Sequence, residues 1–438
     1  MSHYHLMINK LKFLYNRNLS IFLFAGFIFI NLYYFSFNFL NTFLNPTDNG
    51  DEHYQYTVYS ISNFTLENFF YTSSQPFIFF TSIVNYFLES PRHSTRVISL
   101  LASIILIIYF LRRIISTNTG RLENIYKSAL FICAIFITNQ IFIGTPDFLS
   151  VAFVIPPFLL ILENVKFKQI HITFKQSIFV GIFFGLALAT RPTTIVLIFA
   201  FYLTLFLFEG IKPLISKQNL IALITSAILL ISINFLPLIE QQKIILDVKE
   251  VPKETGVTWF QRNYLMAKYW DSNLRPTTQW VSTHEVIDFK KENPQFEFPK
   301  NQIDLLFKEP GLFIRQMIRM FIKALYSNYR FMYLLFPLLF LSFLPDKKLN
   351  IIGQINRSYY KLFENKFIIV FHLLSIIFFS FLAVKLFEFR WVISTMILYS
   401  FFSLTYLSHF PLKIRYLVYN ISFLSGIGMY ILFYIRYF

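Results

Sequence analysis

The sequence has little charge and almost no cysteine. Only 14% of its 438 residues are Asp, Glu, Lys or Arg, whereas 55% are hydrophobic. This composition lies outside the range of soluble globular domains. The single cysteine, Cys133, excludes an intramolecular disulfide bond, so cysteine usage indicates no redox compartment. A glycine-rich nucleotide loop, a Cys/His zinc spacing and a tandem repeat are also missing from the sequence, which excludes the functions that those motifs indicate.

What the sequence has instead is a series of long apolar runs. Because an α-helix needs roughly 20 residues to cross a bilayer, these runs predict an all-α polytopic membrane protein with about 11 transmembrane helices. The first run follows basic residues, as in a signal peptide, but it is too long and has no clear cleavage site, so a retained span is expected. The expected spans are residues 19–40, 94–111, 128–143, 147–162, 176–190, 193–208, 219–238, 331–344, 367–384, 391–408 and 416–435.

The charges between these runs predict which way the protein faces. Alternate loops hold sixteen Lys and Arg residues against five Asp and Glu, namely loops 112–127, 163–175, 209–217, 345–366 and 409–415. The positive-inside rule places these loops and the N-terminus in the cytoplasm. The net charge of +16 is therefore interpreted as a topology and lipid signal, and no nucleic acid partner is expected.

An acidic cluster follows the first apolar run, on the predicted external side. No Lys or Arg occurs between Asn18 and Pro91, yet this stretch contains Asp48, Asp51 and Glu52. Carboxylates at a membrane face cost free energy, and the usual reason to keep them is chemistry or ion binding. Desolvation raises a carboxyl pKa, which would allow Asp51 or Glu52 to accept a proton from a hydroxyl. The structural alternative is that Asp48 or Asp51 caps a short helix.

Four other polar residues are predicted on the same side. Asp147 opens an expected span, where the helix dipole alone would favour it. Arg191 lies at the external end of a span, where it either anchors the helix in the headgroups or binds a phosphate. Lys385 and Arg390 allow the same two interpretations. All four residues are expected on the external side of the membrane, and this shared position is the first indication of a site.

Two external segments are expected to fold. Apolar residues at helical spacing predict short interfacial helices in the 41–92 loop. The 239–330 segment, with fourteen Lys and Arg and eleven Asp and Glu, is expected to form a small folded unit ending in an amphipathic helix suited to an anionic membrane surface. The expected organisation is a transmembrane core over 1–238, this external region, and a C-terminal transmembrane bundle over 331–438.

Several motifs in order resemble one known family. They are Gly50-Asp51-Glu52-His53-Tyr54-Gln55-Tyr56, Gln75-Pro76, Pro91-Arg92-His93-Ser94-Thr95-Arg96-Val97, Thr145-Pro146-Asp147, the stretch 181–193 containing Thr190-Arg191-Pro192-Thr193, the segment 307–313 and Glu388-Phe389-Arg390. Together they resemble the C-type membrane glycosyltransferases, nearest to the bacterial branch of the protein O-mannosyltransferase and aminoarabinose transferase family. The resemblance is good over residues 10–210 and patchy beyond.

The resemblance implies a direct displacement. Asp51, with Glu52 beside it, is the expected general base that deprotonates an acceptor hydroxyl as it attacks the sugar, and polyprenyl phosphate leaves. The expected donor-phosphate and substrate-binding residues are Asp147, Arg191, Lys385, Arg390, His53 and Tyr54. The residues alone leave open whether a divalent metal ion binds at Asp51 and Asp147.

The expected partners are a polyprenyl-phosphate-linked sugar donor, a lipid, glycan or protein acceptor, and membrane lipid. The Phe-, Ile-, Asn- and Lys-rich composition is typical of an AT-rich bacterial genome, so the expected location is a bacterial inner membrane with the site facing outward. One alternative is a lipid-linked sugar flippase or transporter, which would need charged residues within spans, whereas here all are expected outside spans or at their ends. The other is a polysaccharide polymerase or ligase, which would rely on basic external loops.

Overall fold

The computed structural model describes residues 16–44, 58–116, 120–136, 141–166, 169–242, 256–274, 281–332, 359–382 and 389–437. Within them the protein is helical, apart from the short antiparallel strands β1 (Val165–Lys166) and β2 (Gln169–Ile170). The helices are α2 (Arg17–Asn38), η2 (Phe39–Leu44), α4 (Leu66–Phe70), α5 (Gln75–Leu88), α6 (Pro91–Ile115), α7 (Arg121–Phe136), α8 (Asp147–Asn164), α9 (Phe174–Thr190), α10 (Thr194–Glu209), α11 (Lys217–Ile233), α12 (Phe235–Gln241), α13 (Trp259–Asp271), α14 (Thr283–Glu292), α15 (Gln302–Lys308), α16 (Pro310–Met332), α19 (Tyr359–Leu382), η4 (Phe389–Val392), α20 (Ile393–Tyr406), η5 (Leu407–His409) and α21 (Leu412–Tyr437).

Three helical segments of the described chain are long and apolar enough to cross a membrane. They are Arg17–Leu44, Pro91–Ile115 and Asp147–Asn164. Shorter apolar helices accompany them: Gln75–Leu88, Phe174–Thr190, Thr194–Glu209, Lys217–Ile233 and Lys366–Phe381. By length and composition, the protein therefore has the helices of an integral membrane protein.

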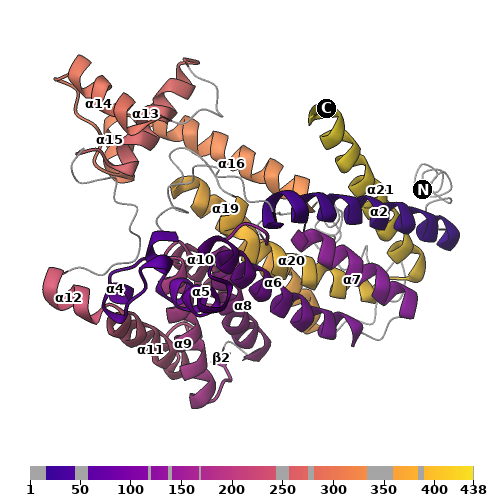
Figure 1. Ribbon diagram of the computed structural model, residues 1–438. Coiled ribbons are helices and arrows are strands. Elements are labelled where there is room, and N and C mark those ends of the chain that lie inside the picture. The colour runs from indigo at the N-terminus through magenta and orange to yellow at the C-terminus, as the bar shows by residue number, and fades with distance from the viewer. Residues whose placement is uncertain are drawn as a thin grey trace.

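The apolar helices form one bundle with an aromatic core. Figure 1 shows α5 to α11, α19 and α20 gathered together, with α2 and α21 side by side along one flank. Phe158 of α8 stacks on Phe201 of α10, with ring centroids 4.5 Å apart, and meets the ring of Phe371 of α19 edge-on at 5.2 Å. The three helices therefore share a single packed centre.

Glycine brings α9 and α11 into close contact. A Cβ atom added at Gly181 would lie 2.4 Å from the carbonyl oxygen of Ala222, and one added at Gly185 would lie 2.8 Å from Leu229. The two glycines are four residues apart and so lie on one face of α9. Small residues at this spacing allow two membrane helices to approach closely, which favours dispersion contacts.

The small unit outside the bundle has its own core. Figure 1 shows α13, α14 and α15 set apart from the other helices, with α16 running from them to the bundle. The buried side chains Tyr264, Leu305, Leu312 and Phe313 pack together there. The amphipathic pattern expected over 310–329 is thus α16, which starts at Pro310.

Polar contacts join loops that the charge pattern places together. At the end of the bundle that carries the N-termini of α6 and α8, here called the site end, Gln75 Nε2 donates to the carbonyl of Ile233 at 3.3 Å. There also, Arg96 Nη1 donates to the carbonyl of Phe43 at 2.9 Å. All four residues belong to segments at the predicted external ends of spans.

At the opposite end, here called the basic end, the contacts join loops predicted to be cytoplasmic. Arg113 pairs with Glu163, and Arg415 Nη1 lies 2.7 Å from Glu123 Oε2. The described contacts at both ends agree with the alternation of loops that the charge bias predicts.

One helix starts earlier than the span that was expected there. The expected span was 128–143, whereas helix α7 already starts at Arg121. Glu123 and Lys127 therefore lie within a helix and are buried, and Lys127 Nζ donates to Ser408 Oγ at 2.7 Å. Lys127 therefore lies in the second turn of α7 and not in a loop that precedes the helix. Hydropathy alone ends a span at a charge, but here distant partners compensate that charge.

One further span differs from expectation, and another lies mostly outside the described residues. The helix expected over 219–238 ends at Ile233, since Asn234 interrupts it before the short α12. The expected span 331–344 lies outside the described residues, except for its first two residues, which belong to α16.

We expect Gly181→Ala to destabilise the protein. The added methyl group would press on the backbone of α11, and overpacking of this kind costs about 1–3 kcal/mol. The matched control is Gly428→Ala on α21, where a Cβ would meet no atom within 4 Å. Thermal unfolding in detergent should show a lower Tm for Gly181→Ala, and an unchanged or slightly higher Tm for the control. Equal Tm values would show that α9 and α11 do not pack through this face.

Candidate functional site

The site end contains an ion triad built from three distant segments. Arg191 Nε lies 3.0 Å from Asp147 Oδ1, and Arg390 Nη1 lies 3.6 Å from Asp147 Oδ2. The Asp147 side chain is only 3% exposed, whereas the two arginines are 13% and 14% exposed. The carboxylate is therefore enclosed, with a guanidinium facing each of its oxygens.

Local sequence explains why each member lies where it does. Asp147 is the first residue of α8, where the helix dipole favours a negative charge. Arg191 caps the C-terminus of α9, where a positive charge is favoured, and Pro192 cannot continue that helix. Arg390 lies in the 3₁₀ turn η4, immediately before α20. Helix ends thus supply all three charges.

A hydroxyl pair fixes the turn behind the triad. Ser150 lies one helical turn after Asp147, and its Oγ donates to the carbonyl of Ala187 at 3.3 Å. The Ser150 Oγ is also 2.8 Å from Thr194 Oγ1. The backbone N–H of Thr194 in turn donates to the carbonyl of Arg191 at 2.9 Å. These bonds join α8, α9 and α10 directly beside the ion pair.

The chain that leads into the acidic loop is held close to this turn. A Cβ at Gly144 would lie 2.1 Å from Thr95 Oγ1, so the turn before Asp147 presses against the start of α6. One turn along α6, Ser99 Oγ donates to the carbonyl of Thr145 at 2.8 Å. The neighbouring Arg96, which is buried, bonds to the carbonyl of Phe43 at the end of η2.

Sequence reasoning missed Arg96. It lies in the second turn of α6, as the third residue of the expected span 94–111, and a cation buried in a span is itself a functional signal. The sequence places it in the motif 91–97 without indicating a role. The structure shows it connecting the end of the first span to α6.

The structure describes three of the eight predicted site residues, and it brings those three together. They are Asp147, Arg191 and Arg390. The remaining predicted residues lie outside the described residues: Asp51, Glu52, His53, Tyr54 and Lys385.

The described part of the chain holds no cluster of three or more His, Cys, Asp or Glu side chains placed to bind a metal ion. Because a guanidinium faces each oxygen of Asp147, a divalent cation would have to displace an arginine to bind there. The arrangement therefore fits Asp147 as a partner of arginines better than as a metal ligand.

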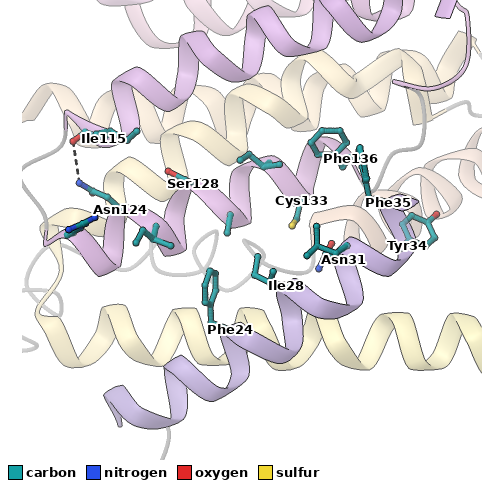
Figure 2. Close-up of a pocket in the computed structure, with 15 residues that line it drawn as sticks. Phe24, Ile28, Asn31, Tyr34, Phe35, Ile115, Asn124, Ser128, Cys133 and Phe136 are labelled. Carbon is teal, nitrogen blue, oxygen red and sulfur yellow. Dashed lines mark hydrogen bonds between the residues drawn. The ribbon is translucent and has the colours of Figure 1, made fainter. Parts of the chain in front are cut away.

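An apolar groove of about 860 Å³ lies between α2 and α7 (Figure 2). Phe24, Ile28 and Cys133 are among the residues that line it. At the groove's end nearer the site, Phe35 and Phe136 have ring centroids 4.9 Å apart, and Phe35 also lies 5.3 Å from Phe142. Aromatic contacts thus run from the groove towards the turn that precedes α8.

No protein-family model, curated protein or solved structure matches this chain.

We expect Asp147→Asn to lower the stability of the protein strongly. Removing one partner of a buried ion pair leaves the other charges uncompensated and costs about 3–5 kcal/mol. The control is Asp288→Asn, because Asp288 and its partner Lys291 are largely exposed and such pairs contribute about 0–1 kcal/mol. Thermal unfolding of both variants in detergent checks this. A Tm for Asp147→Asn equal to that of the control would mean that the triad does not stabilise the fold.

Proposed function

We propose that the protein is a membrane glycosyltransferase of the C type, with about 11 spans, that moves a sugar from a polyprenyl-phosphate donor to a hydroxyl acceptor. The observation that carries this proposal is the meeting of Asp147, Arg191 and Arg390 at one end of the bundle. The charge bias of the loops supports a site that faces the exterior, and the Phe-, Ile-, Asn- and Lys-rich composition supports a bacterial inner membrane.

The two arginines are proposed to bind the phosphate of the donor. As the bond between sugar and phosphate breaks, negative charge develops on the leaving oxygen, and fixed cations stabilise it. Guanidinium groups suit this task because their parallel N–H groups match phosphate oxygens. Taken by themselves, the three residues carry one net positive charge, and Arg191 and Arg390 are more exposed than Asp147. Asp147 is therefore the residue that positions the arginines.

Asp51 is proposed to be the general base, with Glu52 beside it. Its carboxylate takes the proton of the acceptor hydroxyl, whose oxygen bonds to the anomeric carbon while polyprenyl phosphate leaves with the electron pair of the broken bond. Asp51 follows Leu44 by seven residues, which an extended chain spans in at most about 25 Å. Leu44 itself follows Phe43, whose carbonyl is bound by Arg96 beside the turn before Asp147. His53, Tyr54 and Lys385 complete the proposed substrate contacts.

The groove between α2 and α7 is the proposed place for the lipid tail of the donor. Its lining is mostly apolar, although Asn31, Asn124 and Arg121 also line it, and α2 on one side of it is long and apolar enough to cross a membrane. The Phe35 and Phe136 end leads through Phe142 towards Asp147, so a chain in the groove would present its headgroup on the side of the arginines.

A lipid-linked sugar flippase is the main competing function. Lys127 is the observation in its favour, since it is a buried charge within a helix. It lies near the start of α7, however, and bonds to Ser408 at the basic end, so it does not extend the triad into the bundle. The polymerase or ligase alternative would depend on basic external loops rather than on Asp51.

We expect Asp51→Asn to abolish sugar transfer while leaving expression and membrane insertion intact. An amide cannot accept the proton, and loss of a general base costs roughly 10²–10⁴-fold in rate. The assay is transfer from labelled polyprenyl-phosphate sugars in proteoliposomes, with Asp48→Asn as the neighbouring control. Retained transfer in Asp51→Asn would remove Asp51 as the base. Leaflet exchange of the donor without turnover in the unmodified protein would identify a flippase.

We expect Arg390→Lys and Arg191→Lys to keep the positive charge but lose the planar pair of donors. Transfer should fall by roughly 10²–10³-fold for each, as when one preorganised donor to a developing charge is removed. The control is Arg113→Lys, whose ion pair with Glu163 lies at the basic end. The same proteoliposome assay measures kcat and KM for each variant. If both variants transfer as fast as the control, the arginines do not serve the leaving phosphate.

A further inference from the structure

Helix α16 has a long apolar face that the described part of the protein leaves exposed. Ile314, Ile318 and Ile322 follow one another at four-residue spacing and are 47%, 48% and 60% exposed. Leu325 and Tyr326 continue the row and are also exposed. Residues at this spacing share one side of a helix, so the three isoleucines form a stripe about 12 Å long.

A basic row runs parallel to this stripe. Arg315, Arg319 and Lys323 each follow one of the isoleucines. Arg315 binds Asp271 through Nε and Nη2, at 3.0 and 2.7 Å, and Arg319 Nη1 lies 3.3 Å from the same carboxylate. The hydrogen bond from Arg315 holds the pKa of Asp271 below its ordinary value, so this carboxylate stays charged at neutral pH. Both arginines remain largely exposed, and with Asp271 they carry a net positive charge.

The opposite face of α16 is fully used in packing. Its first part contributes Leu312 and Phe313 to the core of the small unit, and its later part contributes Met320 and Ala324 to the core of the bundle. The ring of Phe313 also meets that of Phe381 on α19 at 5.3 Å. The helix is therefore fixed between the core of the small unit and the core of the bundle. Neither core covers the isoleucine stripe.

Phe313, the residue before Ile314, connects this part of α16 to an apolar surface of α19. Phe381, which Phe313 touches, is 41% exposed, and Ile377 one turn before it is 44% exposed. An apolar stripe flanked by basic side chains is typical of helices that lie in the plane of a membrane surface. Lys and Arg near the surface also favour anionic lipids.

We propose that α16 lies in the plane of an anionic bilayer surface at the site end of the bundle. The Ile314, Ile318 and Ile322 side chains enter the boundary of the acyl chains, and the exposed Arg315 and Arg319 lie at the level of the phosphate headgroups. The partner of this face is the membrane itself. This assignment does not depend on the proposed sugar transfer.

Cys133 is the single native cysteine. Once it is replaced, a thiol-reactive probe attaches only to a cysteine introduced at a chosen position. In the full-length Cys133→Ser protein, a fluorescent probe is attached in turn to Ile314→Cys, Ile318→Cys and Ile322→Cys. The control is Glu297→Cys, since Glu297 lies in the small unit with a side chain 88% exposed. Each protein is placed in nanodiscs containing phosphatidylglycerol. The quenchers are lipids brominated near the headgroup end of the acyl chain, lipids brominated near the chain terminus, and aqueous iodide.

We expect the shallow bromines to quench most of the emission at the three isoleucine positions and the deep bromines to quench less. The Glu297 position should respond to iodide alone, and discs without phosphatidylglycerol should give weaker lipid quenching at the isoleucines. Stronger quenching by deep bromines would overturn the proposal, because α16 would then cross the bilayer. Quenching by iodide alone would place the stripe in water, and protection from all three quenchers would mean that a protein covers it. Either result would also overturn the proposal.

Discussion

The enclosed carboxylate of Asp147, held between Arg191 and Arg390, is the constraint on which the site end of this protein depends. An ionised group removed from water is costly unless opposite charges approach it closely. Here those charges come from the end of α9 and from the turn before α20, so neither segment can move without exposing or isolating the carboxylate. The electrostatic requirement therefore fixes three elements that are far apart in the sequence.

Helix α9 shows how packing and charge are joined in one stretch of sequence. Its middle carries Gly181 and Gly185, which bring it against α11, and its end carries Arg191. A helix placed this closely against its neighbour has little freedom to slide, so the position of its last residue is determined by its middle. The hydroxyl pair of Ser150 and Thr194 then fixes the turn that follows.

Charge alternation along the sequence was enough to predict that Asp147, Arg191 and Arg390 share one side, because polar residues of a membrane protein gather at helix ends. It could not predict which of them meet, and Lys385 was as good a candidate as Arg390. The start of α7 was missed for a related reason. Hydropathy treats Glu123 and Lys127 as the edge of a span, whereas Arg415 and Ser408, almost 300 residues away, make both tolerable inside a helix.

If the protein is the proposed glycosyltransferase, its lipid-linked donor and its hydroxyl acceptor reach the site by different routes. A lipid-linked donor diffuses in the plane of the membrane and can enter only between helices, as the groove between α2 and α7 allows. A hydroxyl acceptor on a glycan or protein would come from water. Helix α16 joins the small unit of α13 to α15 to the bundle, since it belongs to the core of the small unit and also packs against α19 and η4, which carries Arg390. A membrane-seated α16 would then hold the phosphate-binding arginine at a fixed depth, which a reaction between a lipid headgroup and a water-borne hydroxyl requires.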